Sequence, residues 1–330
     1  MPRTLVTRAI ISMLAAAAAL PLHAQSPQSP TFPAKAVRII VPYPVGSGID
    51  VLARQLADRL APGWGQPITV ENRPGASTIP AVELAAKSAP DGHTILLTTD
   101  ASISINPHLF AKLPYDAAKD LAPVTLLVLL QQLLVAHPAF PAATLAELIT
   151  LARSRPGTIN YGSYGSGSQP HLAGEMLKSK ATIDLVHIPY KGLPLAVAAV
   201  LGGEIQLTFS GIASSQPHLR AGKLKALAIG GERRSTLLPD VPTFAELGYP
   251  EVETHAWFGL FVPRGTPEDI INRIQQDAVR IVTEPGFRDK EIIAKGYELV
   301  ANSPTAFAAY LRTDSANRAR AVRISGARAD

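Results

Sequence analysis

The sequence has no cysteine, which excludes disulfide bonds, thiolate metal sites and a lipid anchor attached to an N-terminal cysteine. It also lacks any run of basic residues. The formal net charge of +5 falls to +3 without residues 1–24, which contain Arg3 and Arg8. So weak a basic excess gives no reason to expect a nucleic acid partner.

The composition is instead that of a well-packed folded protein. Hydrophobic residues make up 47% and charged residues 17% of the 330 residues, which excludes a mostly disordered chain. A chain of this length can form two lobes of ordinary domain size with a crevice between them.

The N-terminal residues have the pattern of a secretory signal peptide. Arg3 and Arg8 give a positive start, residues 9–20 are almost all apolar, and Ala24 is a small residue before the expected cleavage site. Twelve apolar residues cannot span a bilayer, which needs about 20. A short buried helix is the alternative, but the basic flank favours export. We therefore expect residues 1–24 to be a signal peptide and the mature protein to be periplasmic.

The chain is organised around residues 39–60. An apolar, β-branched run ends at two prolines, a loop with Gly46, Ser47 and Gly48 follows, and leucines then recur at helical spacing. A strand, loop and helix in this order point backbone N–H groups and the positive end of a helix dipole at one place, which can hold a carboxylate or phosphate. An ordinary tight turn is the alternative. We interpret Asp50 as the helix N-cap rather than as a ligand contact.

Residues 160–177 repeat this plan. Glycines and hydroxyl side chains follow a short strand, and Pro170 suits the first turn of a helix, where its missing N–H group would have been unpaired. Two such loops in two lobes predict an acidic ligand that is gripped from both sides.

Strands and helices alternate along the chain, which predicts an α/β fold with mostly parallel sheets. Ligands of such sheets bind beyond the carboxyl ends of the strands. The continuously apolar residues 124–135 are predicted to be a buried strand that enters a second lobe. We expect residues 25–123 and 230–330 to form lobe 1 and residues 124–229 to form lobe 2. The C-terminal part is expected to be helical over 267–282, over 285–294 and from 304 onward.

Eight short motifs in order carry a family resemblance over essentially the whole mature chain. They are Val41-Pro42-Tyr43-Pro44 with Gly46-Ser47-Gly48-Ile49-Asp50, Glu71-Asn72-Arg73-Pro74-Gly75-Ala76, Ala89-Pro90-Asp91-Gly92, Leu113-Pro114-Tyr115-Asp116, Asn160-Tyr161-Gly162-Ser163 to His171-Leu172-Ala173-Gly174-Glu175, Pro189-Tyr190-Lys191-Gly192, Leu238-Pro239-Asp240-Val241-Pro242-Thr243 and Trp257-Phe258-Gly259. In these motifs the sequence resembles the Bug-type extracytoplasmic solute receptors of tripartite tricarboxylate transporters. The resemblance implies a type II periplasmic binding protein-like fold with an interlobe ligand cleft, and small carboxylate ligands that are handed to a membrane permease.

Two departures from the family pattern bear on the ligand. Where the family usually has Gly-Gly-Asn-Ile-Gly, residues 77–81 read Ser-Thr-Ile-Pro-Ala, and Ser210 stands where an aspartate is common. Loss of that negative charge is expected to favour a more anionic ligand, or a neutral end in place of an ammonium.

The candidate ligand-binding residues lie on the strand-end loops of both lobes. They are Tyr43, Val45, Gly46, Ser47, Gly48, Ser102, Ser163, Tyr164, Gly165, Ser166, Ser168, His171, Tyr190, Lys191 and Ser210. The aromatic rings either wall the pocket or pack beneath it, and the lysine either binds a carboxylate or is a solvated rim residue. We expect no cofactor and no metal site, because the glycine loop does not fit a nucleotide fingerprint and the histidines lack metal-binding spacing.

These expectations favour a receptor that closes two lobes on a dicarboxylate, an aromatic acid or an amino acid and delivers it to a permease. We expect it to be a monomer. An exported hydrolase is the main alternative from another class. No Gly-x-Ser-x-Gly motif surrounds Ser163 or Ser166, and no nucleophile is identified beside His171, so we expect no enzymatic activity. A ligand-sensing partner of a membrane sensor is a further alternative.

Overall fold

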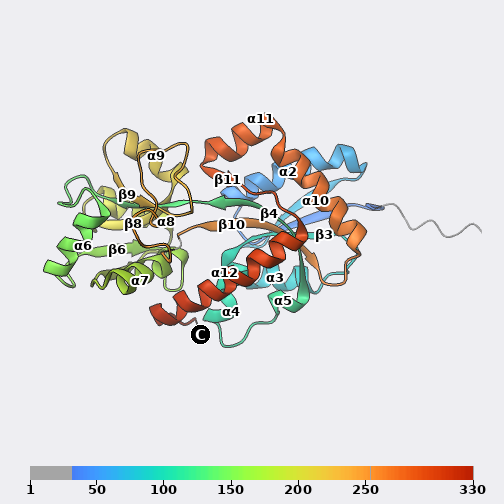
Figure 1. Ribbon diagram of the computed structural model, residues 1–330. Coiled ribbons are helices and arrows are strands. Elements are labelled where there is room, and N and C mark those ends of the chain that lie inside the picture. The colour runs from blue at the N-terminus through green and yellow to red at the C-terminus, as the bar shows by residue number, and fades with distance from the viewer. Residues whose placement is uncertain (1–31, 253, 330) are drawn as a thin grey trace, which may run out of the picture.

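The computed structural model describes residues 32–252 and 254–329. The predicted signal peptide, residues 1–24, lies outside the described residues. The chain forms two lobes side by side, and each lobe is built on one β-sheet that helices cover on both faces (Figure 1). Within the described part of the chain, no helix combines the length and the apolar character needed to cross a bilayer.

The sheet of lobe 1 has six strands in the order β11-β4-β10-β3-β1-β2. Their bounds are β1 Val37–Val41, β2 Ile68–Asn72, β3 Thr94–Thr99, β4 Leu121–Leu130, β10 Ala256–Pro263 and β11 Tyr297–Leu299. Successive residues of a strand point to opposite faces. Ile39 therefore packs with α2 (Gly48–Trp64) and α10 (Glu268–Thr283), whereas Ile40 packs with α3 (Ile79–Ala86) and α12 (Pro304–Ser325).

The sheet of lobe 2 has five strands in the order β7-β6-β8-β5-β9. Their bounds are β5 Gln132–Ala136, β6 Asn160–Ser163, β7 Val186–Pro189, β8 Leu207–Gly211 and β9 Lys225–Ile229. Leu134 packs with α6 (Leu145–Ser154) and α7 (Gln169–Ala181) on one face. Leu133 packs with α8 (Leu193–Leu201) and α9 (Ile212–Arg220) on the other.

Both sheets are mixed, which corrects the expectation of mostly parallel sheets. β1 runs parallel to β2 and β3, and β6 runs parallel to β7 and β8, as crossover helices require. β4, β10 and β5 run antiparallel to their neighbours because they carry the chain directly between the two sheets.

The residues 124–135 form parts of two strands rather than one. β4 belongs to the first sheet and β5 to the second, and Gln131 joins them. Figure 1 shows this green segment and the orange β10 running between the lobes. β9 pairs with β5, and Phe244 and Val252 pack into the apolar cluster of lobe 2. The lobe boundaries stay a proposal. On these assignments we propose that the chain passes into lobe 2 at Gln131 and returns to lobe 1 just before β10.

The remaining elements are single turns or little more. They are η1 Ala76–Thr78, η2 Ala101–Ile105, α4 Asn106–Leu109, α5 Ala117–Asp120, α11 Pro285–Phe287, η3 Arg288–Ile292 and η4 Ile293–Lys295. The prediction that residues 285–294 are helical is confirmed, although they do not form one regular α-helix. The winding changes twice in that stretch, and Phe287 and Ile292 both reach the core of lobe 1.

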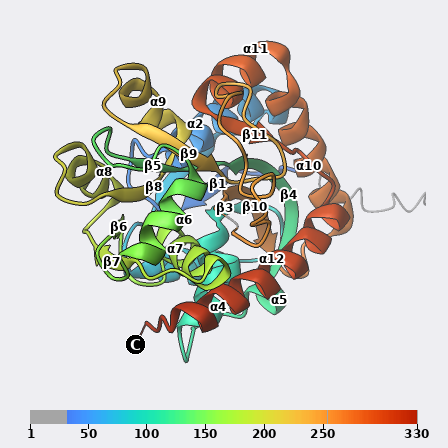
Figure 2. The same ribbon diagram turned by 60° about the vertical axis from the view of Figure 1, so that its left-hand side comes forward.

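The last helix connects the two lobes. α12 begins where predicted, with Ser303 accepting a hydrogen bond from the Ala306 N–H at 3.2 Å. Its N-terminal part packs on the lobe 1 sheet through Phe307, and its C-terminal part packs against α7 through Ala321 and Val322. Figure 2 shows α12 passing alongside α7.

Candidate ligand-binding site

Two loops follow the carboxyl ends of parallel strands in the two sheets. The first loop, residues 42–47, joins β1 to α2, and the second loop, residues 164–168, joins β6 to α7. The carboxyl ends of β3 and β8 lie at the same sheet edges, because β3 is parallel to β1 and β8 to β6.

Asp50 holds the shape of the first loop. Its carboxylate accepts hydrogen bonds from the Gly46 N–H at 2.8 Å and from Asn72 Nδ2 at 2.8 Å, and it pairs with Arg54 at 3.0 Å. Burial alone would raise the pKa of Asp50, but the bonds from Arg54, Gly46 and Asn72 outweigh burial and lower that pKa. Ser47 is the N-cap of α2, so the interpretation of Asp50 as the N-cap is wrong.

Ser163 and His171 hold the shape of the second loop. The Gly165 N–H donates to Ser163 Oγ at 3.0 Å, and the Gly167 N–H donates to His171 Nδ1 at 3.0 Å. Burial lowers the pKa of His171, which keeps its ring neutral and able to accept this bond. Both side chains therefore organise the loop from beneath.

These bonds change which backbone groups a ligand can use. The amides of Gly46, Gly165 and Gly167 are engaged within their own loops, whereas the sequence analysis expected the loop glycines to hold the ligand. The free donors are instead in the first turn of α2, whereas at the start of α7 the Gln169 N–H bonds to Tyr164 and Pro170 has no N–H group. Among the described residues, the N–H groups of Gly48 and Ile49 have no hydrogen-bond partner.

The two helices begin with matching N-caps. Ser47 has φ −66° and ψ 156°, and Ser168 has φ −66° and ψ 155°. Neither serine caps its own helix: Ser168 Oγ donates to the Gly165 carbonyl, and Ser47 Oγ is buried without a partner within the described residues. Gly211, with φ −65° and ψ 156°, starts α9 in the same way and has no side chain to cap it. Three helix N-termini at these strand ends are thus left uncapped.

The link between the two loops runs through Tyr43 and Tyr164. Burial raises the pKa of Tyr43 to about 12, although a hydrogen bond of 2.9 Å to Thr99 lowers that pKa. Burial also raises the pKa of Tyr164 of lobe 2, and the charge of Asp100 and then Tyr43, both of lobe 1, raise it further. Tyr164 is nevertheless 41% exposed. The charge effects of Asp100 and Tyr43 on Tyr164 mean that its hydroxyl lies near residues of lobe 1.

A buried charged array beneath this contact was missed by the sequence analysis. Arg318 of α12, 2% exposed, lies 3.5 Å from Asp100 and 3.3 Å from Asp314, and its Nη2 donates to the His255 carbonyl at 2.6 Å. Burial raises the pKa of Asp100 to about 6, because the charge of Arg318 offsets only part of the desolvation. The polar residue after β3 was a visible signal, but nothing in the sequence pairs it with an arginine 218 positions away.

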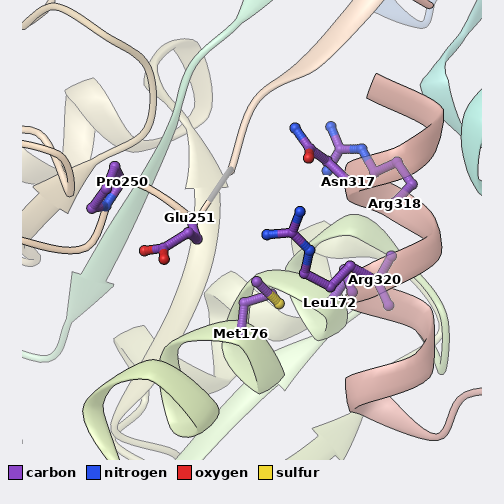
Figure 3. Close-up of a pocket in the computed structure, with 8 residues that line it drawn as sticks. Leu172, Met176, Pro250, Glu251, Asn317, Arg318 and Arg320 are labelled. Carbon is purple, nitrogen blue, oxygen red and sulfur yellow. The ribbon is translucent and has the colours of Figure 1, made fainter. Parts of the chain in front are cut away.

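The array lies next to the contact of α7 with α12. Figure 3 shows Leu172 and Met176 on α7 facing Asn317, Arg318 and Arg320 on α12 around a cavity of about 120 Å³. Arg318 thus contacts His255, which lies just before β10, and also lines the cavity between α7 and α12.

Gln169 is a second residue that the sequence analysis did not single out. It is the first residue of α7 and is 2% exposed, yet neither its amide nitrogen nor its amide oxygen has a partner in the described part of the chain. Gln169 precedes Leu172 by three residues and so shares the face of α7 that meets α12. An unpaired buried amide needs an explanation, and one explanation is that it hydrogen-bonds to a polar group of a bound ligand.

Some of the other candidate residues are buried and stabilise the structure around the loops, and the rest are exposed on the surface. Ser102 is buried, and its hydroxyl bonds to Thr98 at 2.6 Å and to Thr78 at 2.8 Å. Ser210 is buried, and its hydroxyl lies 2.9 Å from that of Ser214. Tyr190 packs into the apolar cluster under α8. The exposed residues are Val45, Ser166 and Lys191.

Ser163 and His187 form a serine–histidine pair beside the second loop, with Ser163 Oγ 2.6 Å from His187 Nε2. Ser163 is fully buried, and its hydroxyl also bonds within the second loop. Burial, and then the charge of His171, lowers the pKa of His187 to about 4. The pair therefore supports the loop. The described residues contain no cluster of histidine and acidic side chains that could hold a metal ion.

Comparisons with known proteins place these features in a family. Residues 52–325 match the model of the tripartite tricarboxylate transporter family receptor. Protein BugT of Bordetella pertussis is 39% identical over 242 residues, which cover 73% of this chain and 74% of BugT. A Rhodopseudomonas palustris protein solved with adipate is 30% identical, with a TM-score of 0.78 over 89% of this chain and 98% of its own. The R. palustris protein MatC, solved with bound malate, is 31% identical, with a TM-score of 0.74 over 88% of this chain and 100% of its own.

Proposed function

Since the chain belongs to the family of tripartite tricarboxylate transporter receptors, we propose that it closes its two lobes on a small carboxylate and delivers it to a membrane permease. Members of this family are periplasmic solute-binding proteins and not enzymes, and this chain has their α/β fold with two mixed sheets. Export through residues 1–24 and a monomeric state are parts of the same proposal.

One observation carries the proposal. Uncapped helix N-termini follow the strand ends of both sheets, and Tyr164 of one lobe lies within electrostatic range of Tyr43 and Asp100 of the other. The first-turn N–H groups and the helix dipole favour an anion at each N-terminus. A ligand with a carboxylate between them is held by main-chain donors from both lobes.

The class of ligand follows from the donors and from the relatives. Adipate and malate, found in the two R. palustris structures, each carry two carboxylates. We propose that this protein likewise takes a small acid, with one carboxylate at the first turn of α2 and a second polar group near α7. Closure then excludes water, which strengthens these hydrogen bonds.

Thermal-shift measurements on the mature protein test the binding step. A carboxylate at about 100 times its Kd stabilises the protein by about 2.7 kcal/mol through mass action, so a panel of small acids should contain at least one that raises Tm clearly. Gly46→Ala and Gly165→Ala strain loop residues whose φ values are 83° and 127°, and they should reduce that shift.

Gly203→Ala is the matched control. Its φ is 74°, an added Cβ meets no atom within 4 Å, and it lies in a turn between α8 and β8. It should lower Tm to a similar extent but keep the ligand-induced shift. A shift that survives both loop variants would contradict binding at the two loops.

Uptake of the identified acid tests the delivery step. Cells that lack this gene should lose uptake at low external concentrations, and the wild-type gene should restore it. Unchanged uptake together with a lost transcriptional response to the acid would instead support a sensor.

A further inference from the structure

A large cavity lies at the two crossings between the lobes, away from both cleft loops. Its volume is about 760 Å³, and we call it the hinge cavity. Gln131 of the first crossing and His255 of the second crossing both line it. The rest of its wall comes from Leu129 of β4, from β11 and Val300, from residues 231–252 and from α12, and no residue of the first or second loop contributes to it.

The walls of the hinge cavity are fixed by hydrogen bonds. Gln131 Nε2 donates to the Arg233 carbonyl at 2.8 Å, which ties the first crossing to the segment after β9. His255 Nε2 lies 3.0 Å from the Tyr310 hydroxyl, which ties the second crossing to α12. The cavity is therefore a built feature and has the volume of a small-molecule site.

Part of the lining of the hinge cavity, which we call its floor, is apolar. Five aliphatic or aromatic side chains contribute to it, namely Leu129, Phe244, Val252, Leu299 and Val300. Phe244 and Val252 are each 2% exposed. This surface suits the hydrocarbon part of a ligand.

The exposed charged part of the lining, which we call the rim, carries two carboxylates and one guanidinium; a third carboxylate, that of Asp314, is buried and paired with Arg318. Glu232, Arg233 and Glu298 line the cavity and are exposed, and within the described residues their side chains have no hydrogen-bond or ion-pair partner that would compete with a ligand. Burial raises the pKa of Glu298, Arg233 opposes this effect, and Glu232 adds to it. A cation placed between the two carboxylates would relieve their repulsion, and the net negative rim disfavours a carboxylate.

We propose that the hinge cavity is a second binding site, which takes a small amphipathic amine with its hydrocarbon part on the apolar floor and its ammonium group at Glu232 and Glu298. Such an occupant touches both crossings, and its charge is opposite to that of the acid expected at the cleft loops. The two sites therefore select different molecules.

Isothermal titration calorimetry with hexylamine tests the proposal on the mature protein. We expect one saturable site, and affinity for hexanoate, which has the same chain but the opposite charge, lower by about tenfold or more. Glu298→Gln should weaken hexylamine binding about threefold, the effect of one partly exposed ion pair. Glu268→Gln is the control, because Glu268 is exposed on α10 and outside the cavity.

A cavity-filling variant separates the site from charge effects at the surface. Thr313 is exposed on α12 and lines the cavity, so Thr313→Phe should abolish hexylamine binding while the protein stays folded. Thr305→Phe, at an exposed position in the first turn of the same helix, should not. Equal binding of hexylamine and hexanoate, retained binding in Thr313→Phe, or competitive displacement of hexylamine by the carboxylate identified at the cleft would each overturn the proposal. The cleft variants Gly46→Ala and Gly165→Ala test the proposed function separately.

Discussion

Replacing Gln169 with leucine tests whether the buried amide at the start of α7 opposes closure in the absence of ligand. The amide nitrogen and oxygen of Gln169 are both buried without a partner in the described part of the chain. Leucine has a similar volume and no polar atoms, so Gln169→Leu removes the unpaired groups and keeps the packing.

The magnitude follows from the two unpaired atoms. Leaving one buried polar group unpaired costs about 1–3 kcal/mol, so the pair costs the arrangement with Gln169 buried on the α12 side of α7, which we take as the closed form, at least about 2 kcal/mol without ligand. Removing that penalty multiplies the ratio of closed to open molecules by about 30. A ligand-free protein that is about 1% closed would then be about a quarter closed, without any ligand.

Small-angle X-ray scattering measures this change. The radius of gyration of ligand-free Gln169→Leu should be smaller than that of the wild type, and the decrease caused by ligand should be smaller too. Gln276→Leu, at an exposed position of α10, is the control and should scatter like the wild type. If Gln169→Leu and Gln276→Leu scatter alike without ligand, the amide does not control closure.

Three further predictions concern the strand-end loops. The pKa of Asp100, raised from 3.8 to about 6, makes the wild type lose stability as pH rises through that window, so urea unfolding of the wild type should weaken relative to Asp100→Asn by about 3 kcal/mol between about pH 4 and pH 7. Ser77 has φ 53°, so Ser77→Gly should raise the free energy of unfolding by about 0.5–1 kcal/mol in the same assay; an unchanged value would show that the loop is not strained. Ser210→Asp adds a buried negative charge after β8 and should weaken carboxylate binding about tenfold or more by calorimetry; an unchanged ligand ranking would mean that residue 210 does not read the ligand.

The sequence predicted local structure well where a chemical signal marks a boundary. Thr144 and Glu147 have capping-box spacing, and the Glu147 N–H donates to Thr144 Oγ1 at 3.2 Å as expected. The four apolar residues that recur at helical spacing after Thr144 are all buried, namely Leu145, Leu148, Ile149 and Ala152. The break at Gln131 had no such signal. β4 and β5 are both covered on two faces, so neither shows polar alternation, and the run reads as a single strand.

The candidate site was predicted in outline because its loops are local. Its electrostatics are not local: Asp100 and Arg318 meet only after the chain has formed both sheets and returned through α12. The use of the loop amides was also hidden. Asp50 was interpreted as the helix N-cap and His171 as a ligand contact, but their side chains accept hydrogen bonds from the N–H groups of Gly46 and Gly167. Spacing shows which donors a loop contains, but only the folded loop shows which of them remain free.

The uncapped helices connect these findings to binding. A serine N-cap that bonds to its own helix contributes about 1 kcal/mol, yet Ser47 and Ser168 start α2 and α7 without that bond, and Gly211 starts α9 without a side chain. This stabilisation is therefore absent at helix N-termini that follow strands of both sheets. An acid that accepts hydrogen bonds from these first turns recovers it only when the lobes are close enough for one molecule to reach helices of both sheets. Ligand binding and closure then stabilise each other, because the ligand supplies the hydrogen-bond acceptors and closure brings the helices of both sheets within its reach.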